Sequence, residues 1–296
     1  MAQGALFLGI RQKHIYKEET PMDVTVKQTW RKVTVLVSFI IMVAVNALAN
    51  TLPLNGVMTG AVADRYQNLF TPAPLTFGIW GVIYLLLLIY VVFQLIPVRD
   101  GGDPARQLLL NKVSLWFGIS SLLNAGWVFA WHYDQIPLTM VLMVLLLLTL
   151  MRVGWLLRAP HCSPREEMAL RLPFGVYFGW ITVATIANAT VLLRSLNWDA
   201  LGLSEPVWTV LILVIGVLIA SFTMYRIRNV GYGLAVLWAF TGILIRHISP
   251  LWYGGQYTQI IMVTVASLAV LFVALVMTAI HMRKVAACTI DTQENN

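Results

Sequence analysis

The sequence has little charge: only 11% of its 296 residues are Asp, Glu, Lys or Arg, against about 25% in a soluble globular domain. Apolar residues make up 59% of the chain, and the mean hydropathy is +0.77. A water-soluble fold built from this chain would lack the polar side chains needed to cover its surface. The composition therefore excludes a soluble globular protein and predicts an integral membrane protein.

Cysteine is scarce too, and this limits the chemistry that the chain can support. Cys162 and Cys288 lie in hydrophilic connections, without the spacing of a metal site or a disulfide framework. The formal net charge is +7, but the basic residues lie in short gaps between apolar runs rather than on one soluble face. We therefore expect no bound cofactor or metal and no nucleic-acid partner.

Long apolar runs dominate the rest of the sequence. A helix that crosses a bilayer needs roughly 20 mostly apolar residues, and eight runs approach or exceed this length, which predicts an all-α protein with eight transmembrane helices. These spans are Val33–Leu52, Phe77–Ile96, Leu108–Phe129, Pro137–Leu157, Leu172–Leu193, Pro206–Met224, Gly231–Ile245 and Ile260–Ile280. The seventh is short and is interrupted by glycines.

The basic residues indicate how the chain lies in the membrane. With eight spans, all 20 Lys and Arg residues except Arg65, Arg194 and Arg246 fall on one side. Cytoplasmic loops are the ones that collect Lys and Arg. The pattern predicts a multi-pass protein of the cell membrane with both termini in the cytoplasm.

Ionisable side chains are nearly absent from the predicted spans. No Asp or Glu lies within them, and their basic residues lie close to the predicted cytoplasmic ends, as Lys112 does. Ionisable groups inside a bilayer usually mark ion paths or proton relays. Their absence weakens the case for a proton-coupled transporter, and no arrangement of residues typical of an enzyme is visible.

Instead, the spans carry amides and aromatic rings at helical spacing. The stripes are Asn46 and Asn50; Phe77, Trp80 and Tyr84; Trp116, Ser120, Asn124, Trp127 and Trp131; and Tyr177, Trp180, Ala184 and Asn188. One interpretation is that the amides join helices while Trp and Tyr form an interfacial belt. The other is that these faces meet around an uncharged pocket for a planar hydrophobic ligand. The connection Pro53–Thr76 is then either a lid over that pocket or an ordinary solvated loop.

Three tracts resemble the signatures of the tryptophan-rich sensory protein family (TspO/MBR), which includes the mitochondrial translocator protein. The tract Pro72–Tyr84 reads PAPLTFGIWGVIY, and Leu123–Trp127 reads LNAGW. The third tract places a small residue and an Asn four and eight residues after Trp180. The three matches occur in order and on three different spans.

The resemblance implies a five-helix bundle that binds porphyrins and other tetrapyrroles, sterols or aromatic drugs beneath the first loop. The residues that it implies contact the ligand are Trp80, Tyr84, Asn124, Trp127, Trp180, Ala184 and Asn188. A porphyrin would be a ligand of such a protein rather than a cofactor. No tyrosine follows Asn188 to complete a steroid-recognition pattern, so cholesterol is not the expected ligand.

The predicted organisation is a cytoplasmic segment 1–32, a TspO-like bundle 33–195, three additional spans 196–282 and a cytoplasmic tail 283–296. The additional spans could cover one flank of the bundle, replace a dimer partner or add a further function. Small-residue pairs, Gly216 with Ala220 and Ser121 with Ala125, leave a homo-oligomer open.

The predicted function is a sensor- or receptor-like membrane protein that binds a planar hydrophobic molecule. Its expected partners are the lipid bilayer and that small molecule. A transporter of small hydrophobic solutes is the alternative, and a porphyrin-modifying enzyme ranks third.

Overall fold

The computed structural model describes residues 21–52, 54–57, 62, 65–96, 103–158 and 163–294. Within these ranges it describes no side chains for residues 21–27, 50 and 284–294. The predicted segment 1–32 therefore lies mostly outside the described residues. So do Cys162 and the side chains of Asn50 and Cys288.

Eight helices in the described part of the chain are long and apolar enough to cross a membrane. They are α1 (Pro21–Thr51), α3 (Ile79–Leu95), α4 (Pro104–His132), α5 (Ile136–Leu156), α7 (Leu172–Ser195), α8 (Glu205–Ile227), α9 (Val230–Ile248) and α10 (Thr258–Glu294). Each contains most of one predicted span, and the described residues include no strand. The prediction of an all-α, eight-span membrane protein is confirmed.

Short helical elements connect or extend the long helices. They are η1 (Leu54–Gly56), η2 (Pro74–Gly78), α6 (Pro164–Glu166), η3 (Glu167–Arg171) and η4 (Ala200–Gly202). The elements α6, η3 and α7 are continuous, so the fifth span starts at Pro164 instead of the predicted Leu172. A capping box starts it early: the Ser163 hydroxyl accepts from the Glu166 amide, and the Glu166 carboxylate accepts from the Ser163 amide.

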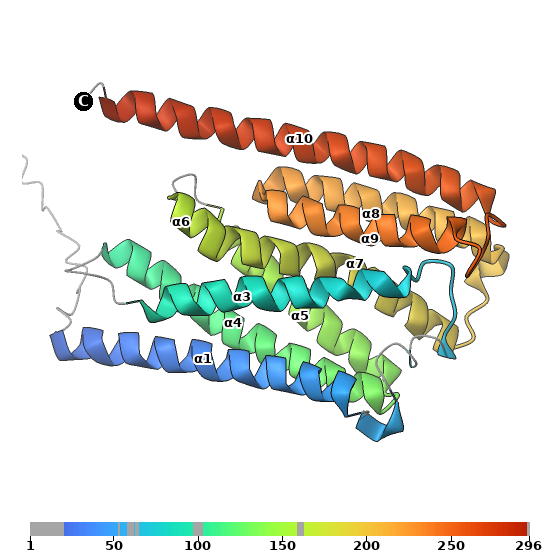
Figure 1. Ribbon diagram of the computed structural model, residues 1–296, viewed down its shortest axis with the longest axis horizontal. Helices are drawn as coiled ribbons and strands as arrows, with labels where there is room; N and C mark the ends of the chain where they lie inside the picture. Colours follow the sequence, from blue (N-terminus) through green and yellow to red (C-terminus); the bar gives the residue numbers. More distant parts are fainter. Residues whose placement is uncertain are drawn as a thin grey trace, which may run out of the picture.

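Five of the helices form a closed ring in the order α1, α3, α7, α5, α4 (Figure 1). The contacts of α4 with α1 and α5, and those of α5 with α7, are extensive. In contrast, the backbone of α3 comes close to those of its neighbours α1 and α7 at few positions. Side chains therefore fill much of the space between α3 and these two helices. This ring is the predicted five-helix bundle.

The other three helices cover one flank of the ring. Helix α9 packs along α7, and α10 packs over α9 and α8 on the side away from the ring (Figure 1). Most of α7 is buried as a result. Of the three roles considered for the additional spans, the structure shows the first, that of covering a flank.

Glycines on α7 make the contact with α9 close. A Cβ atom at Gly179 would collide with the Tyr232 carbonyl oxygen and lie 3.0 Å from the Cβ of Ala235, and a Cβ at Gly175 would overlap Asn229. Small residues at a helix crossing let backbones approach and gain van der Waals contact, which drives helix association in membranes.

Large apolar side chains remain exposed on the outward faces of the helices. Examples are Leu85 of α3, Leu218 of α8 and Phe272 of α10, which are 62%, 64% and 58% exposed. Exposed apolar surface of this extent is unfavourable in water. The bilayer therefore contacts these faces.

One expectation about charge is wrong. Lys112 is exposed, whereas Arg31, Arg171 and Arg246 lie in helices and are no more than 9% exposed. The helices extend past the apolar runs from which their ends were predicted, and so they include these arginines. Each guanidinium has an oxygen partner, on the side chains of Asn111 and Glu167 and on the Pro72 carbonyl, respectively.

The described chain begins and ends at the same end of the bundle, as an even number of crossings requires (Figure 1). Arg65, Arg194 and Arg246, the three basic residues that the sequence placed on the other side of the membrane, lie at the opposite end of the bundle. There Arg194 donates to the Gln67 carbonyl and Arg246 to the Pro72 carbonyl, both in the connection before α3.

The two small-residue pairs are used inside the bundle. Gly216 packs against Ile186 and Phe240, Ala220 is 1% exposed, and Ser121 and Ala125 are buried. These pairs are therefore not available for contact with a second copy. The formation of a homo-oligomer stays a prediction, and the pairs do not support it.

Candidate ligand-binding site

An aromatic cluster fills the ring between α3 and α7. The Trp80 ring stacks on that of Tyr84, one turn later on α3, with centroids 5.7 Å apart and 23° between the planes. The same indole meets Tyr177 and Trp180 of α7 edge-on, at 6.0 and 6.2 Å. Phe77, at the end of η2, meets Trp180 at 5.9 Å. The indoles of Trp80 and Trp180 thus face the interior and not lipid.

Two hydrogen bonds made by amide side chains join neighbouring helices of the ring. Asn46 of α1 donates to the Oδ1 of Asn124 on α4 at 2.7 Å, and Asn188 of α7 donates to the Thr139 hydroxyl of α5 at 3.1 Å. Each bond satisfies a polar group that would otherwise lie unpaired among apolar side chains. The interpretation of the amides as links between helices is therefore supported for Asn46, Asn124 and Asn188.

Polar atoms without partners remain next to those bonds. In the described part of the chain, six of the buried side-chain atoms that lack a hydrogen bond belong to the amide and aromatic stripes: Tyr84 Oη, Asn124 Nδ2, Trp127 Nε1, Tyr177 Oη, Trp180 Nε1 and Asn188 Oδ1. The Tyr177 hydroxyl lies near Asn124 but does not reach hydrogen-bond geometry. Because buried polar atoms are nearly always paired in proteins, these atoms are the ones that could bond to a polar group of a ligand.

Trp127 lies apart from the aromatic cluster. Its ring stacks on Trp131 with centroids 5.3 Å apart, and it packs both on the central core and on a small group that includes Val62 and Val191. Ala184 is half-buried between Trp180 and Asn188 on α7. The structure therefore brings Trp80, Tyr84 and Trp180 together and leaves Trp127 apart from them. Asn124 and Asn188 bond to neighbouring helices, and Ala184 lies one turn after Trp180.

Phe77 and Tyr177 also belong to the aromatic cluster, although they are not among the seven residues that the resemblance implied. Both lie on the aromatic stripes of the sequence, spaced three residues from Trp80 and Trp180, respectively. Helical periodicity was the signal that could have added them.

The described part of the loop before α3 is packed. Leu69 and Phe70 are buried and join the same apolar core as Trp180. Asn68 accepts from the Phe70 amide at 3.1 Å, and the Tyr66 hydroxyl donates to Asp134 at 3.0 Å. Burial, followed by the bond to Asp134, raises the pKa of Tyr66, so this hydroxyl stays protonated and keeps donating. These contacts favour a lid over a solvated loop.

Helix α9 holds the segment that leads to Trp80. The Ala73 amide donates to the Gly242 carbonyl at 3.0 Å, and the Trp238 indole donates to the Thr76 carbonyl at 2.9 Å. The Thr76 side chain is fully buried over Gly242, where a Cβ atom would collide with it. The additional helices therefore fix the entry to α3, and with it the start of the aromatic cluster.

A family model described as TSPO-like protein matches residues 32–278. The chain belongs to the TSPO-like protein family. No curated protein and no solved structure matches it. Membership agrees with the resemblance found in the three sequence tracts. The TSPO-like match also continues beyond 195, where that resemblance ended, and includes α8, α9 and most of α10.

The candidate site is made of uncharged groups. The aromatic cluster and the two amides offer ring faces, indole N–H groups, phenol hydroxyls and carboxamides. Among the described residues, no three His, Cys, Asp or Glu side chains lie together as a metal site would need. The arrangement can stack a flat apolar molecule and orient it with a few hydrogen bonds.

Proposed function

We propose that the ring binds a planar hydrophobic molecule of the porphyrin or tetrapyrrole class and that the protein acts as a sensor or receptor for it. The observation that carries the proposal is the group of six unpaired polar atoms beside the aromatic cluster. An apolar site with a few polar groups at fixed positions is typical of ligand pockets. Membership in the TSPO-like family supports the same class of function.

Binding would require the aromatic cluster to open. Trp80 contacts Tyr84, Tyr177 and Trp180 directly, so a flat ligand has to displace its indole. Helix α3 is suited to this adjustment, because its backbone approaches α1 and α7 at few positions. The polar atoms of Tyr84, Trp180 and the amides would then pair with the ligand or with water.

We further propose that the protein binds its ligand without transforming it. The only titratable groups in the cluster are the phenols of Tyr84 and Tyr177, which are weak acids near pH 7. A general acid or base works best with a pKa near the operating pH. Formation of a new absorbing product from bound protoporphyrin would overturn this part of the proposal.

For the orientation, we propose that both termini face the cytoplasm of the cell membrane. The support is the distribution of Lys and Arg together with the position of both ends of the described chain at one end of the bundle. Fusion of alkaline phosphatase to the C-terminus tests it: the fusion should be inactive, and an active one would place the tail outside.

Titration of the purified protein with protoporphyrin IX tests ligand binding. Because removing tryptophans alters protein fluorescence, the porphyrin's own absorption band is the better readout. We expect saturable binding that is lost in the double variant Trp80→Ala, Trp180→Ala. The matched control Trp30→Ala, Trp252→Ala removes two indoles that are exposed outside the ring and should bind normally. Equal binding by both double variants would remove the proposed site.

A further inference from the structure

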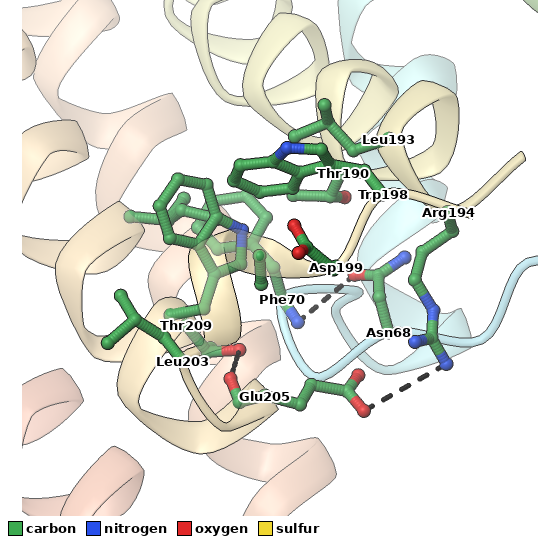
Figure 2. Close-up of a pocket in the computed structure, with 13 residues that line it drawn as sticks. Asn68, Phe70, Thr190, Leu193, Arg194, Trp198, Asp199, Leu203, Glu205 and Thr209 are labelled. Atoms are coloured by element: carbon green, nitrogen blue, oxygen red, sulfur yellow. Dashed lines mark hydrogen bonds and ion pairs between the residues drawn. The ribbon is translucent and has the colours of Figure 1, made fainter. Parts of the chain in front are cut away.

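A cavity lies at the C-terminal end of α7. Its volume is about 260 Å³, and it lies between the end of α7, the connection through η4 and the start of α8, with the loop before α3 as one wall (Figure 2). The residues that decide its chemistry are Phe70, Arg194, Trp198, Asp199, Glu205 and Trp208.

This cavity is separate from the ring interior. On α7, Asn188 bonds to α5 inside the ring, whereas Thr190 lines the cavity. Two residues further along a helix is a rotation of about 200°, so the two side chains leave α7 on nearly opposite faces. Glu205 and Trp208 belong to α8, so the cavity exists only because the chain continues beyond the ring.

Aromatic rings form two of its walls. Trp198 and Trp208 meet edge-to-face with centroids 4.7 Å apart and 68° between the planes. Phe70, which is 1% exposed, adds a third ring. The face of an indole attracts an ammonium ion more strongly than other aromatic side chains do.

The charges around the cavity favour a cation as well. Arg194 lies 3.9 Å from Glu205 and also donates to the Gln67 carbonyl, so its charge is already engaged at the edge of the cavity. No basic side chain of the described chain lies within ion-pair distance of Asp199. In Figure 2 the Asp199 carboxylate lies beneath the Trp198 indole, away from the Arg194–Glu205 pair.

We propose that this cavity binds a small organic cation, a quaternary or substituted ammonium ion, against the indoles of Trp198 and Trp208 that line it, with Asp199 as its counter-charge. The surrounding apolar side chains, Leu193, Leu203 and Ile212, would contact the alkyl substituents. The ammonium could belong to a free solute or to the headgroup of a choline lipid.

Choline and its neutral analogue 3,3-dimethylbutan-1-ol form the test pair, since they differ in the charged nitrogen alone. In uncharged, choline-free dodecyl maltoside micelles, calorimetry should show saturable choline binding about tenfold tighter than that of the alcohol, or more. Equal affinity of the two probes would overturn the proposal, as would the absence of saturable choline binding.

The variant Asp199→Asn isolates the carboxylate. Its amide oxygen can still accept from the Leu201 amide, the bond that Asp199 makes at 3.1 Å, so the turn is preserved while the charge is lost. We expect choline affinity to fall about tenfold, with a similar loss in Trp208→Leu. Asp134→Asn removes another carboxylate at the same end and should bind choline normally. Unchanged binding in Asp199→Asn would overturn the assignment.

Two further experiments distinguish a lipid headgroup from a free solute as the occupant, and this cavity from the ring as the binding site. Adding phosphatidylcholine to the micelles, with diacylglycerol as the control, weakens choline binding when the occupant is a lipid headgroup and leaves it unchanged when it is a free solute. Either result is compatible with the proposed cation. Choline binding should survive in Trp80→Ala, Trp180→Ala; its loss there would show that choline binds in the ring instead.

Discussion

The two faces of α7 are built on different principles. Toward the ring, α7 presents Trp180 and Asn188, and the contact with α3 passes through large rings with polar atoms left unpaired. Toward α9, it presents Gly175 and Gly179, and the backbones nearly touch. Helix α7 is thus packed backbone against backbone on α9, whereas large side chains separate it from α3.

The difference between these two contacts indicates which of them can rearrange. A close backbone contact has few alternative arrangements, because protein interiors are packed like crystals and resist small displacements. A contact between large side chains can rearrange by rotamer changes. We infer that α9 keeps α7 and the entry to α3 in place, while the aromatic cluster is the part that a ligand can open.

The largest effect is expected from overfilling the close face. Gly179→Leu would place a side chain against the Tyr232 carbonyl and Ala235 and should destabilise the protein by about 3 kcal/mol or prevent folding. Thermal unfolding in detergent measures it. The control Gly81→Leu acts on α3, where a Cβ atom meets nothing within 4 Å, and should stay close to the parent protein. Equal stability of the two variants would contradict the α7–α9 contact.

A smaller effect is expected where α9 meets η2. In Gly242→Ala the new methyl group would collide with Thr76, at a cost of about 2 kcal/mol, and the displaced segment should also weaken porphyrin binding. Gly126→Ala is the matched control, since its Cβ would make an ordinary contact of 3.8 Å with Leu142. If Gly242→Ala lost stability but kept full porphyrin affinity, η2 would not position the ring site.

The spans and the stripes could be predicted because both depend on local sequence. The length of an apolar run predicts a crossing, and three- and four-residue steps show which side chains share a face. The position of α9 could not be predicted this way. Gly233 and Gly242 look like interruptions of a weak span in the sequence, but in the structure they make room for neighbours: a Cβ atom at Gly233 would collide with Met224 and Leu275, and one at Gly242 with Thr76.

The candidate site was predictable in part for a related reason. Periodicity fixes the face on which a residue lies, whereas its height relative to a residue on another helix depends on loops and tilt. Trp80, Tyr84 and Trp180 meet at one height, while Trp127 shares the inward face but stacks on Trp131. Arg246 escaped prediction because its charge marked a span end, although α9 continues to Ile248.

A single hydrogen bond should give a smaller change. Trp238→Phe keeps an aromatic ring but removes the donor to the Thr76 carbonyl, which should cost about 1 kcal/mol. We expect faster hydrogen–deuterium exchange in residues 74–80 with little change in α7. Trp30→Phe, on an exposed part of α1, is the control. Unchanged exchange in 74–80 would mean that the indole does not hold this segment.

The smallest effect concerns the amide pair inside the ring. A double-mutant cycle of Asn46→Leu and Asn124→Leu should give a coupling energy near the average for hydrogen bonds between membrane helices, about 0.6 kcal/mol, because Asn46 donates to Asn124. Repeating the cycle with saturating protoporphyrin tests whether a ligand rearranges the ring interior, which only one of the two faces of α7 lines. If the ligand opens the cluster and engages Asn124, the coupling should fall. A coupling of zero without ligand, combined with lost porphyrin binding in Asn124→Leu, would assign these amides to the ligand alone.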